Sequence, residues 1–112
     1  MSAALLDRHC THGAAALDAG AIQALAAQVP DWSVAGDRLE RTFVFRDYFE
    51  TVAFVNALAW MVHREDHHPD LQVGYRRCTA SWTTHSAGHR LSENDFICAA
   101  RADALYTQRS GA

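Results

Sequence analysis

The chain has 112 residues, 49% of them hydrophobic and 21% charged, so it can bury one core but has no room for a second. Its formal net charge of -3 excludes the basic surface that holds nucleic-acid phosphates, and its three cysteines without a C-x-x-C pair argue against a disulfide framework. The sequence has no apolar run long enough to span a membrane and no signal segment. We expect a cytoplasmic protein with reduced thiols and no direct contact with membrane or nucleic acid.

The N-terminal residues 1–17 show no sustained hydrophobic period, which indicates an irregular N-terminal arm. A single domain is expected over 18–112. It begins with a short helix, because Asp18 is a suitable N-cap and apolar residues follow at helical spacing until Pro30.

Apolar residues alternate over 32–45 on either side of a Gly-Asp pair, a pattern that predicts a β-hairpin. A long second helix is predicted over 47–66, where Asp47 and Glu50 resemble a capping box. The four phenylalanines of this region are expected to pack in the core: Phe43, Phe45, Phe49 and Phe54.

Pro69 disfavours helical geometry at the residue before it, so the second helix should end as two adjacent histidines are presented. Alternation over 71–84 predicts a second hairpin. Ser92 with Asp95 forms a capping box that opens a third helix. The order helix, hairpin, helix, hairpin, helix indicates an antiparallel sheet whose apolar face is covered by helices.

Five of the seven histidines lie in two short segments, 63–70 and 84–89. Imidazole titrates near neutral pH, so rings placed close together can hold different protonation states and supply both an acid and a base. This pairing suits a dehydration.

The run Asp66-His67-His68-Pro69 after a long helix resembles the mark of the pterin-4a-carbinolamine dehydratase family. The resemblance extends from Ala21 to Leu105 through motifs in the family's order: Leu39-Glu40-Arg41-Thr42-Phe43-Val44-Phe45, Ala53-Phe54-Val55-Asn56, His67-His68-Pro69-Asp70, Thr84-His85 and Leu91-Ser92-Glu93-Asn94-Asp95-Phe96.

The resemblance implies an α+β fold in which three helices pack on one face of a four-stranded antiparallel sheet, assembled as a homodimer or homotetramer. It implies removal of water from a 4a-hydroxytetrahydropterin, without cofactor or metal, in the recycling that supports aromatic amino-acid hydroxylation. The family's three catalytic histidines correspond to His67, His68 and His85. Further residues are assigned to the site as substrate-binding groups (Asp66, Pro69, Thr84, Ser86 and Asp95) or as modulators (His63 and Glu65).

Two positions depart from the family's pattern. His63 stands where the family often has a glutamate, and the loop after His85 is one residue longer and lacks an acid. If position 63 faces the pocket, His63→Glu should move the acid limb of the pH-rate profile upward, because a carboxylate favours a charged neighbouring imidazole.

Several alternatives remain open. His63 and His67, four residues apart on a helix, could bind a metal together with His85 or Glu65, and a histidine metalloenzyme is one such hypothesis. The cluster of His9, Cys10 and His12 is interpreted as chance sequence in the arm, because no second ligand pair follows. Tyr75 or Trp82 could stack on a pterin. A non-catalytic dimerisation or assembly module of the same fold is the second function considered.

Overall fold

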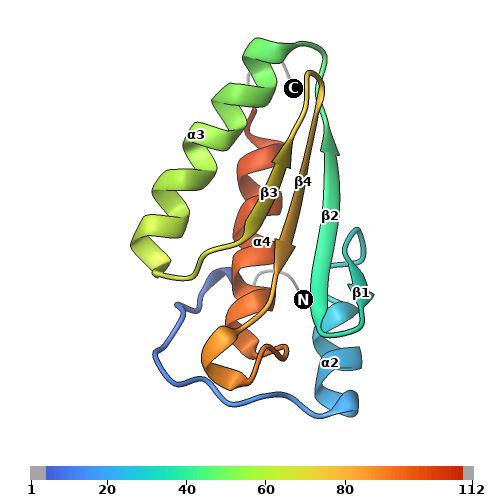
Figure 1. The fold of residues 1–112 in the computed structure, drawn as a ribbon, viewed down its shortest axis with the longest axis vertical. Helices are drawn as coiled ribbons and strands as arrows, with labels where there is room; N and C mark the ends of the chain where they lie inside the picture. Colours follow the sequence, from blue (N-terminus) through green and yellow to red (C-terminus); the bar gives the residue numbers. More distant parts are fainter. Residues whose placement is uncertain (1–4, 110–112) are drawn as a thin grey trace.

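A computed structural model describes residues 5–109 of the protein. Its sheet has the strand order β1-β2-β4-β3, every neighbouring pair is antiparallel, and helices lie against one face (Figure 1). This is the predicted α+β fold. In chain order the elements are α2 (Ala19–Ala26), β1 (Ser33–Ala35), β2 (Arg38–Val44), α3 (Tyr48–Glu65), β3 (Asp70–Val73), β4 (Arg77–Trp82), the 3-10 turn η1 (His85–Ala87) and α4 (Glu93–Thr107).

The helices begin where their capping residues predict. Asp18 accepts a hydrogen bond from the Ala21 N–H at the start of α2, and Ser92 and Asp95 form a complete capping box on α4. At α3, Asp47 accepts from the Glu50 N–H, but the Glu50 carboxylate accepts from the N–H of Arg46 instead of that of Asp47. The second bond of the α3 capping box therefore comes from Arg46, the residue before the N-cap Asp47.

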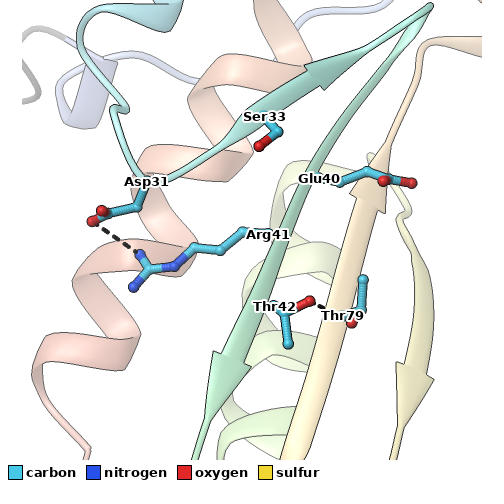
Figure 2. A pocket seen from close by; sticks show the side chains of 6 residues that line it. All are labelled: Asp31, Ser33, Glu40, Arg41, Thr42 and Thr79. Carbon is cyan, nitrogen blue, oxygen red and sulfur yellow. Dashed lines mark hydrogen bonds and ion pairs between the residues drawn. The ribbon is translucent and has the colours of Figure 1, made fainter.

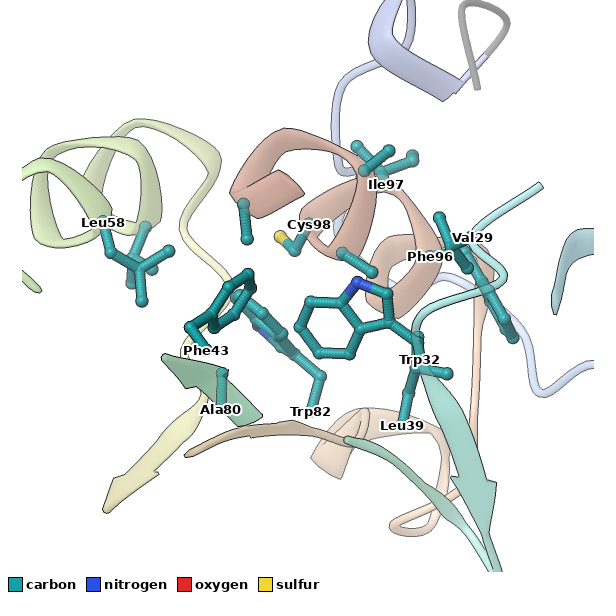
Figure 3. Close-up of a cluster of buried hydrophobic side chains, with 14 of the residues drawn as sticks. Val29, Trp32, Leu39, Phe43, Leu58, Ala80, Trp82, Phe96, Ile97 and Cys98 are labelled. Carbon is teal, nitrogen blue, oxygen red and sulfur yellow. The ribbon is translucent and has the colours of Figure 1, made fainter. Parts of the chain in front are cut away.

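The core lies between the sheet and the helices α3 and α4, with Trp82 and Phe43 at its centre (Figure 3). Phe45 and Phe54 are buried as predicted. Phe49, however, is 78% exposed, so its predicted place in the core is wrong. Phe49 and Phe54 are five residues apart, which corresponds to a rotation of about 140° around the helix axis, so the two rings lie on different faces of α3.

The N-terminal arm, residues 5–17, is mostly irregular but follows the body of the protein closely. Leu5 is fully buried in the core, and the N–H of Leu17 donates to the carbonyl of Leu91 at 2.9 Å. Cys10 packs against the core between these two points. The arm therefore reaches the same end of the molecule as η1, the start of α4 and the chain after α3 (Figure 1).

Within residues 5–109, none of the helices combines the length and the apolar character that crossing a membrane requires.

Candidate active site

The end of α3 presents the two adjacent histidines. The helix stops at Glu65, and Asp66 takes a left-handed conformation with φ 52° while its N–H still donates to the Val62 carbonyl. His67, His68 and Pro69 then run to the first residue of β3 without helical structure. The prediction that the helix ends just before the histidine pair is confirmed.

The third histidine lies at the end of β4. The Thr84 N–H donates to the Arg90 carbonyl at 3.0 Å, which closes a short loop that contains η1. The loop turns through two left-handed residues, Gly88 at φ 75° and His89 at φ 59°. His85 begins this turn, and its ring lies 4.7 Å from the ring of His89, centroid to centroid.

These two chain segments and the arm enclose a cavity of about 320 Å³, within the size range of small-molecule sites. We call it the histidine pocket. It brings together the three predicted catalytic histidines with three of the predicted binding residues. Its lining is Thr11, His12, Gly13, Asp66, His67, His68, Thr83, Thr84, His85, Ser86 and Asn94.

His67 is the histidine with the most restricted ring. Its side chain is only 11% exposed, and its Nε2 lies 2.7 Å from Oδ1 of Asp95. The other carboxylate oxygen of Asp95 accepts from the Thr84 hydroxyl and from the Ser92 N–H, both at 2.8 Å. A carboxylate can only accept hydrogen bonds, so it pairs with the His67 tautomer that carries its proton on Nε2, in which Nδ1 has no proton.

Asp95 lies behind the pocket and does not line it. Its side chain is fully buried, and it also forms part of the capping box at the start of α4. Of Glu65, Asp66 and Asp95, Asp95 is the acid that bonds one of the three predicted catalytic histidines. The same carboxylate therefore orders the helix start and orients the His67 ring.

Glu65 points away from the pocket, toward the arm. Its buried carboxylate accepts from the Cys10 N–H at 2.8 Å and pairs with His9 Nδ1 at 2.9 Å, while Arg101 Nε lies at 3.6 Å. Burial by itself raises the pKa of this carboxyl, but the Cys10 N–H, His9 and Arg101 together lower the pKa below its ordinary value of 4.5. Glu65 thus anchors the arm.

The remaining predicted residues lie outside the pocket lining. His63 is exposed on α3, and Pro69 follows the two histidines without lining the cavity. Tyr75 is 64% exposed in the β3-β4 turn, whereas Trp82 is buried and donates weakly to the His67 carbonyl at 3.4 Å. Neither aromatic ring lines the histidine pocket.

Sequence reasoning missed the contribution of the arm. Thr11, His12 and Gly13 line the pocket, and Asn94 holds the arm through two bonds: its amide donates to the Thr11 carbonyl at 2.8 Å and its Oδ1 accepts from the Thr11 N–H at 3.1 Å. His12 Nε2 lies 3.7 Å from Asp66. The interpretation of His9, Cys10 and His12 as chance sequence concerned metal binding and stays a prediction. It gave no sign that the arm lines a cavity, because a contact between residues 83 positions apart leaves no local signal in the sequence.

A second cavity, of about 400 Å³, lies elsewhere, along β2 near β1 (Figure 2). Its one cation, Arg41, is paired with Asp103 at 2.6 Å and with Asp31 at 3.7 Å. It contains no histidine. The acid-base chemistry that the sequence indicates is therefore concentrated in the histidine pocket.

Comparison with known proteins decides the family. The model of the family described as Pterin 4 alpha carbinolamine dehydratase matches residues 15–105. The chain belongs to this family of hydro-lyases.

A relative from Chromobacterium violaceum, assigned to the pterin-4-alpha-carbinolamine dehydratases, is 47% identical over 104 residues, which cover 91% of this chain and 95% of the relative. One from Xanthomonas oryzae pv. oryzae is 60% identical over 83 residues, 72% of this chain and 70% of the relative. A third, from Nitrosomonas eutropha, is 58% identical over 74 residues, 66% of this chain and 65% of the relative.

Solved structures agree with the fold of this dehydratase family. A transcriptional coactivator/pterin dehydratase from Brucella melitensis superposes with a TM-score of 0.76 at 25% identity, over 80% of this chain and 97% of that one. A pterin dehydratase-like protein identified as a RuBisCO assembly factor in the alpha-carboxysome superposes with a TM-score of 0.57 at 23% identity, over 88% and 96% of the two chains. The second likeness concerns the fold alone.

Proposed function

We propose that this protein converts a 4a-hydroxytetrahydropterin to quinonoid dihydropterin and water by histidine acid-base catalysis. The observation that carries the proposal is the convergence of His67, His68 and His85 on one cavity, with the His67 ring oriented by Asp95. Membership of the dehydratase family supplies the substrate class.

The substrate carries a hydroxyl group on C4a, next to N5. Hydroxide is a poor leaving group, so the C4a–O bond breaks readily only when the oxygen receives a proton. We assign this proton to the imidazolium of His68 or His85, whose rings reach the cavity from two different segments and are more exposed than that of His67. The N5 lone pair forms the C4a=N5 bond as water departs.

His67 is assigned as the base. Because its Nε2–H is directed at Asp95, its Nδ1 lone pair is the nitrogen available to take the proton from N5. One proton leaves the acid and one is received by His67, so exchange with solvent restores the starting state. The reaction consumes no cofactor, and we assign none.

The polar residues of the rim are proposed to hold the pterin. Asp66, Thr84 and Ser86 line the cavity and offer acceptors and donors to the amino and carbonyl groups of a pterin ring. Asp95 is fully buried, so we assign it to positioning His67. Pro69 is assigned to ending the helix before the histidine pair.

The test generates the 4a-hydroxytetrahydropterin in place with an aromatic amino-acid hydroxylase and follows its absorbance decay. Addition of this protein at micromolar concentration should accelerate the decay. The same assay addresses the proposed link to a hydroxylase, because turnover of the hydroxylase should then be sustained. An unchanged decay would instead favour the non-catalytic assembly module as the function of this fold.

We also propose that copies of the chain associate through α3, as a homodimer or homotetramer. Phe49 is 78% and Trp60 74% exposed on this helix. Exposed apolar side chains of this size are typical of a surface that contacts another protein. Sedimentation equilibrium of the wild type and of Phe49→Asp/Trp60→Asp tests this proposal. A monomeric wild type would contradict it.

A further inference from the structure

The arm carries one wall of the histidine pocket and is held to the body at neighbouring points. Thr11, His12 and Gly13 line the cavity, and the residue just before them, Cys10, donates its N–H to Glu65. Any change that moves Cys10 therefore moves the pocket wall that follows it in the chain.

The side chain of Cys10 meets a second thiol. Its Sγ lies 3.6 Å from Sγ of Cys98 on α4, and 3.6 Å from the carbonyl oxygen of Asn94. Both thiols are free; Cys98 is fully buried, whereas Cys10 is partly exposed. A disulfide has its sulfurs about 2.05 Å apart, so the two sulfurs need to approach by about 1.5 Å more to form one.

We propose that Cys10 and Cys98 are a modification site, at which a small peroxide forms a reversible disulfide that fixes the pocket-lining part of the arm to α4. The effect on catalysis rests on the proposed dehydratase function, but formation of the bond does not. The third cysteine, Cys78, is buried on β4 and has no sulfur contact of this kind within residues 5–109.

The order of events follows from access and ionisation. The hydrogen bond with Cys10, together with burial, raises the pKa of the Cys98 thiol, so Cys98 resists becoming the nucleophile toward an external oxidant. The Cys10 sulfur instead attacks hydrogen peroxide, and breaking the O–O bond gives a sulfenic acid and water. The Cys98 sulfur then displaces hydroxyl from the Cys10 sulfur, and its proton leaves with that hydroxyl as a second water. Two thiols are oxidised and one peroxide is reduced.

The bond closes a loop between residues 88 positions apart, so it should raise the melting temperature by roughly 10 °C. It also draws the arm toward α4 next to Thr11 and its partner Asn94. Displacement of a substrate-contacting wall by about 1 Å can slow a reaction by up to about a hundredfold. We therefore expect oxidation to lower kcat/KM by about tenfold to a hundredfold, and a dithiol reductant to restore it.

Tryptic mapping of the full chain tests formation of the bond directly. The sequence has no lysine, and cleavage at arginine places the three cysteines in separate peptides, 9–38, 78–90 and 91–101. After brief peroxide treatment and alkylation, the unreduced digest should contain 9–38 linked to 91–101, with 78–90 alkylated. Cys78→Ala is the matched control and should give the same link, whereas Cys10→Ser should not.

Loss of the linked peptide on treatment with dithiothreitol, together with recovery of kcat/KM, would support the proposal. Cys10 found only as sulfinic acid, or linked to another copy of the chain, would overturn it. The peptide readings do not depend on dehydratase activity, so an inactive protein that forms the bond would refute the proposed function and leave the modification site standing. An active protein that never forms the bond would refute the modification site and leave the proposed function standing.

Discussion

His67 Nε2 and Asp95 Oδ1 lie 2.7 Å apart, although 28 residues separate them in the chain. The bond joins the segment after α3 to the first turn of α4, and it favours the His67 tautomer whose Nδ1 can accept a proton. Asp95 thereby connects the stability of a helix start with the protonation pattern of the pocket.

Asp95→Asn should lower the dehydration rate by about a hundredfold or more, because an amide can donate to Nε2 and so stabilise the tautomer whose Nδ1 carries the proton. Stopped-flow decay of the carbinolamine measures the effect. Ser92→Ala is the control, since it weakens the cap of α4 by about 1 kcal/mol but leaves the His67 contact in place. Equal losses of rate in both variants would attribute the effect to helix stability and contradict the assigned role.

His63→Glu should leave the pH-rate profile where it is in the wild type. The condition for an upward shift of the acid limb was that position 63 faces the pocket, and His63 is exposed and absent from the pocket lining. The substitution places an anion in the last turn of α3, which should cost about 0.3–1 kcal/mol of stability. Profiles of kcat/KM against pH for both proteins provide the test, and a displaced acid limb would mean that position 63 reaches the site.

Glu65→Gln should destabilise the protein by about 1–2 kcal/mol at neutral pH, because a buried carboxylate with charged partners is replaced by a neutral amide. The pKa of Glu65 in the folded state lies below 4.5, so its ionised form stabilises the fold above that pH, and this stabilisation is lost as the pH falls through the lower folded value. The stability difference between wild type and variant should therefore shrink in acid.

Urea denaturation at a series of pH values down to about pH 3 measures this difference. Glu93→Gln is a matched control, since Glu93 forms an exposed pair with Arg8 and its loss should change stability little at any pH. A constant difference for Glu65→Gln across the series would show that its ionisation does not contribute.

Chelators should leave the dehydration rate unchanged, because protonation of a hydroxyl group by imidazolium needs no Lewis acid. Within the part of the chain that is described, no cluster of three or more histidine, cysteine or acidic residues is arranged to hold a metal ion. Activity that disappeared with EDTA and returned with zinc or iron would support the histidine metalloenzyme instead.

The elements could be predicted because their signals are local. Capping residues, Pro69 and the alternation of apolar residues each act within a few positions, and the helix starts at Asp18, Asp47 and Ser92 follow from them. The position of Phe49 could not be read in this way, because an aromatic residue near a helix start fits either face until the packing of the sheet is known.

The pocket is formed by contacts between distant parts of the chain, and residue spacing in the sequence does not predict such contacts. The three histidines could be named from the sequence, but the sequence does not show which acid contacts His67, and only the fold brings Asp95 within 2.7 Å of it. The arm is the clearest case. Its contact through Asn94 and Thr11 spans 83 residues, and composition alone gives that segment no reason to line a cavity.

The most direct test of the central claim is single-turnover decay of a 4a-hydroxytetrahydropterin with wild type and with His67→Ala, His68→Ala and His85→Ala. Each variant should remain folded by circular dichroism and lose about a hundredfold to ten-thousandfold in rate, the range of a lost acid or base. If all three folded variants kept near-wild-type rates, the histidine pocket would not be the catalytic site.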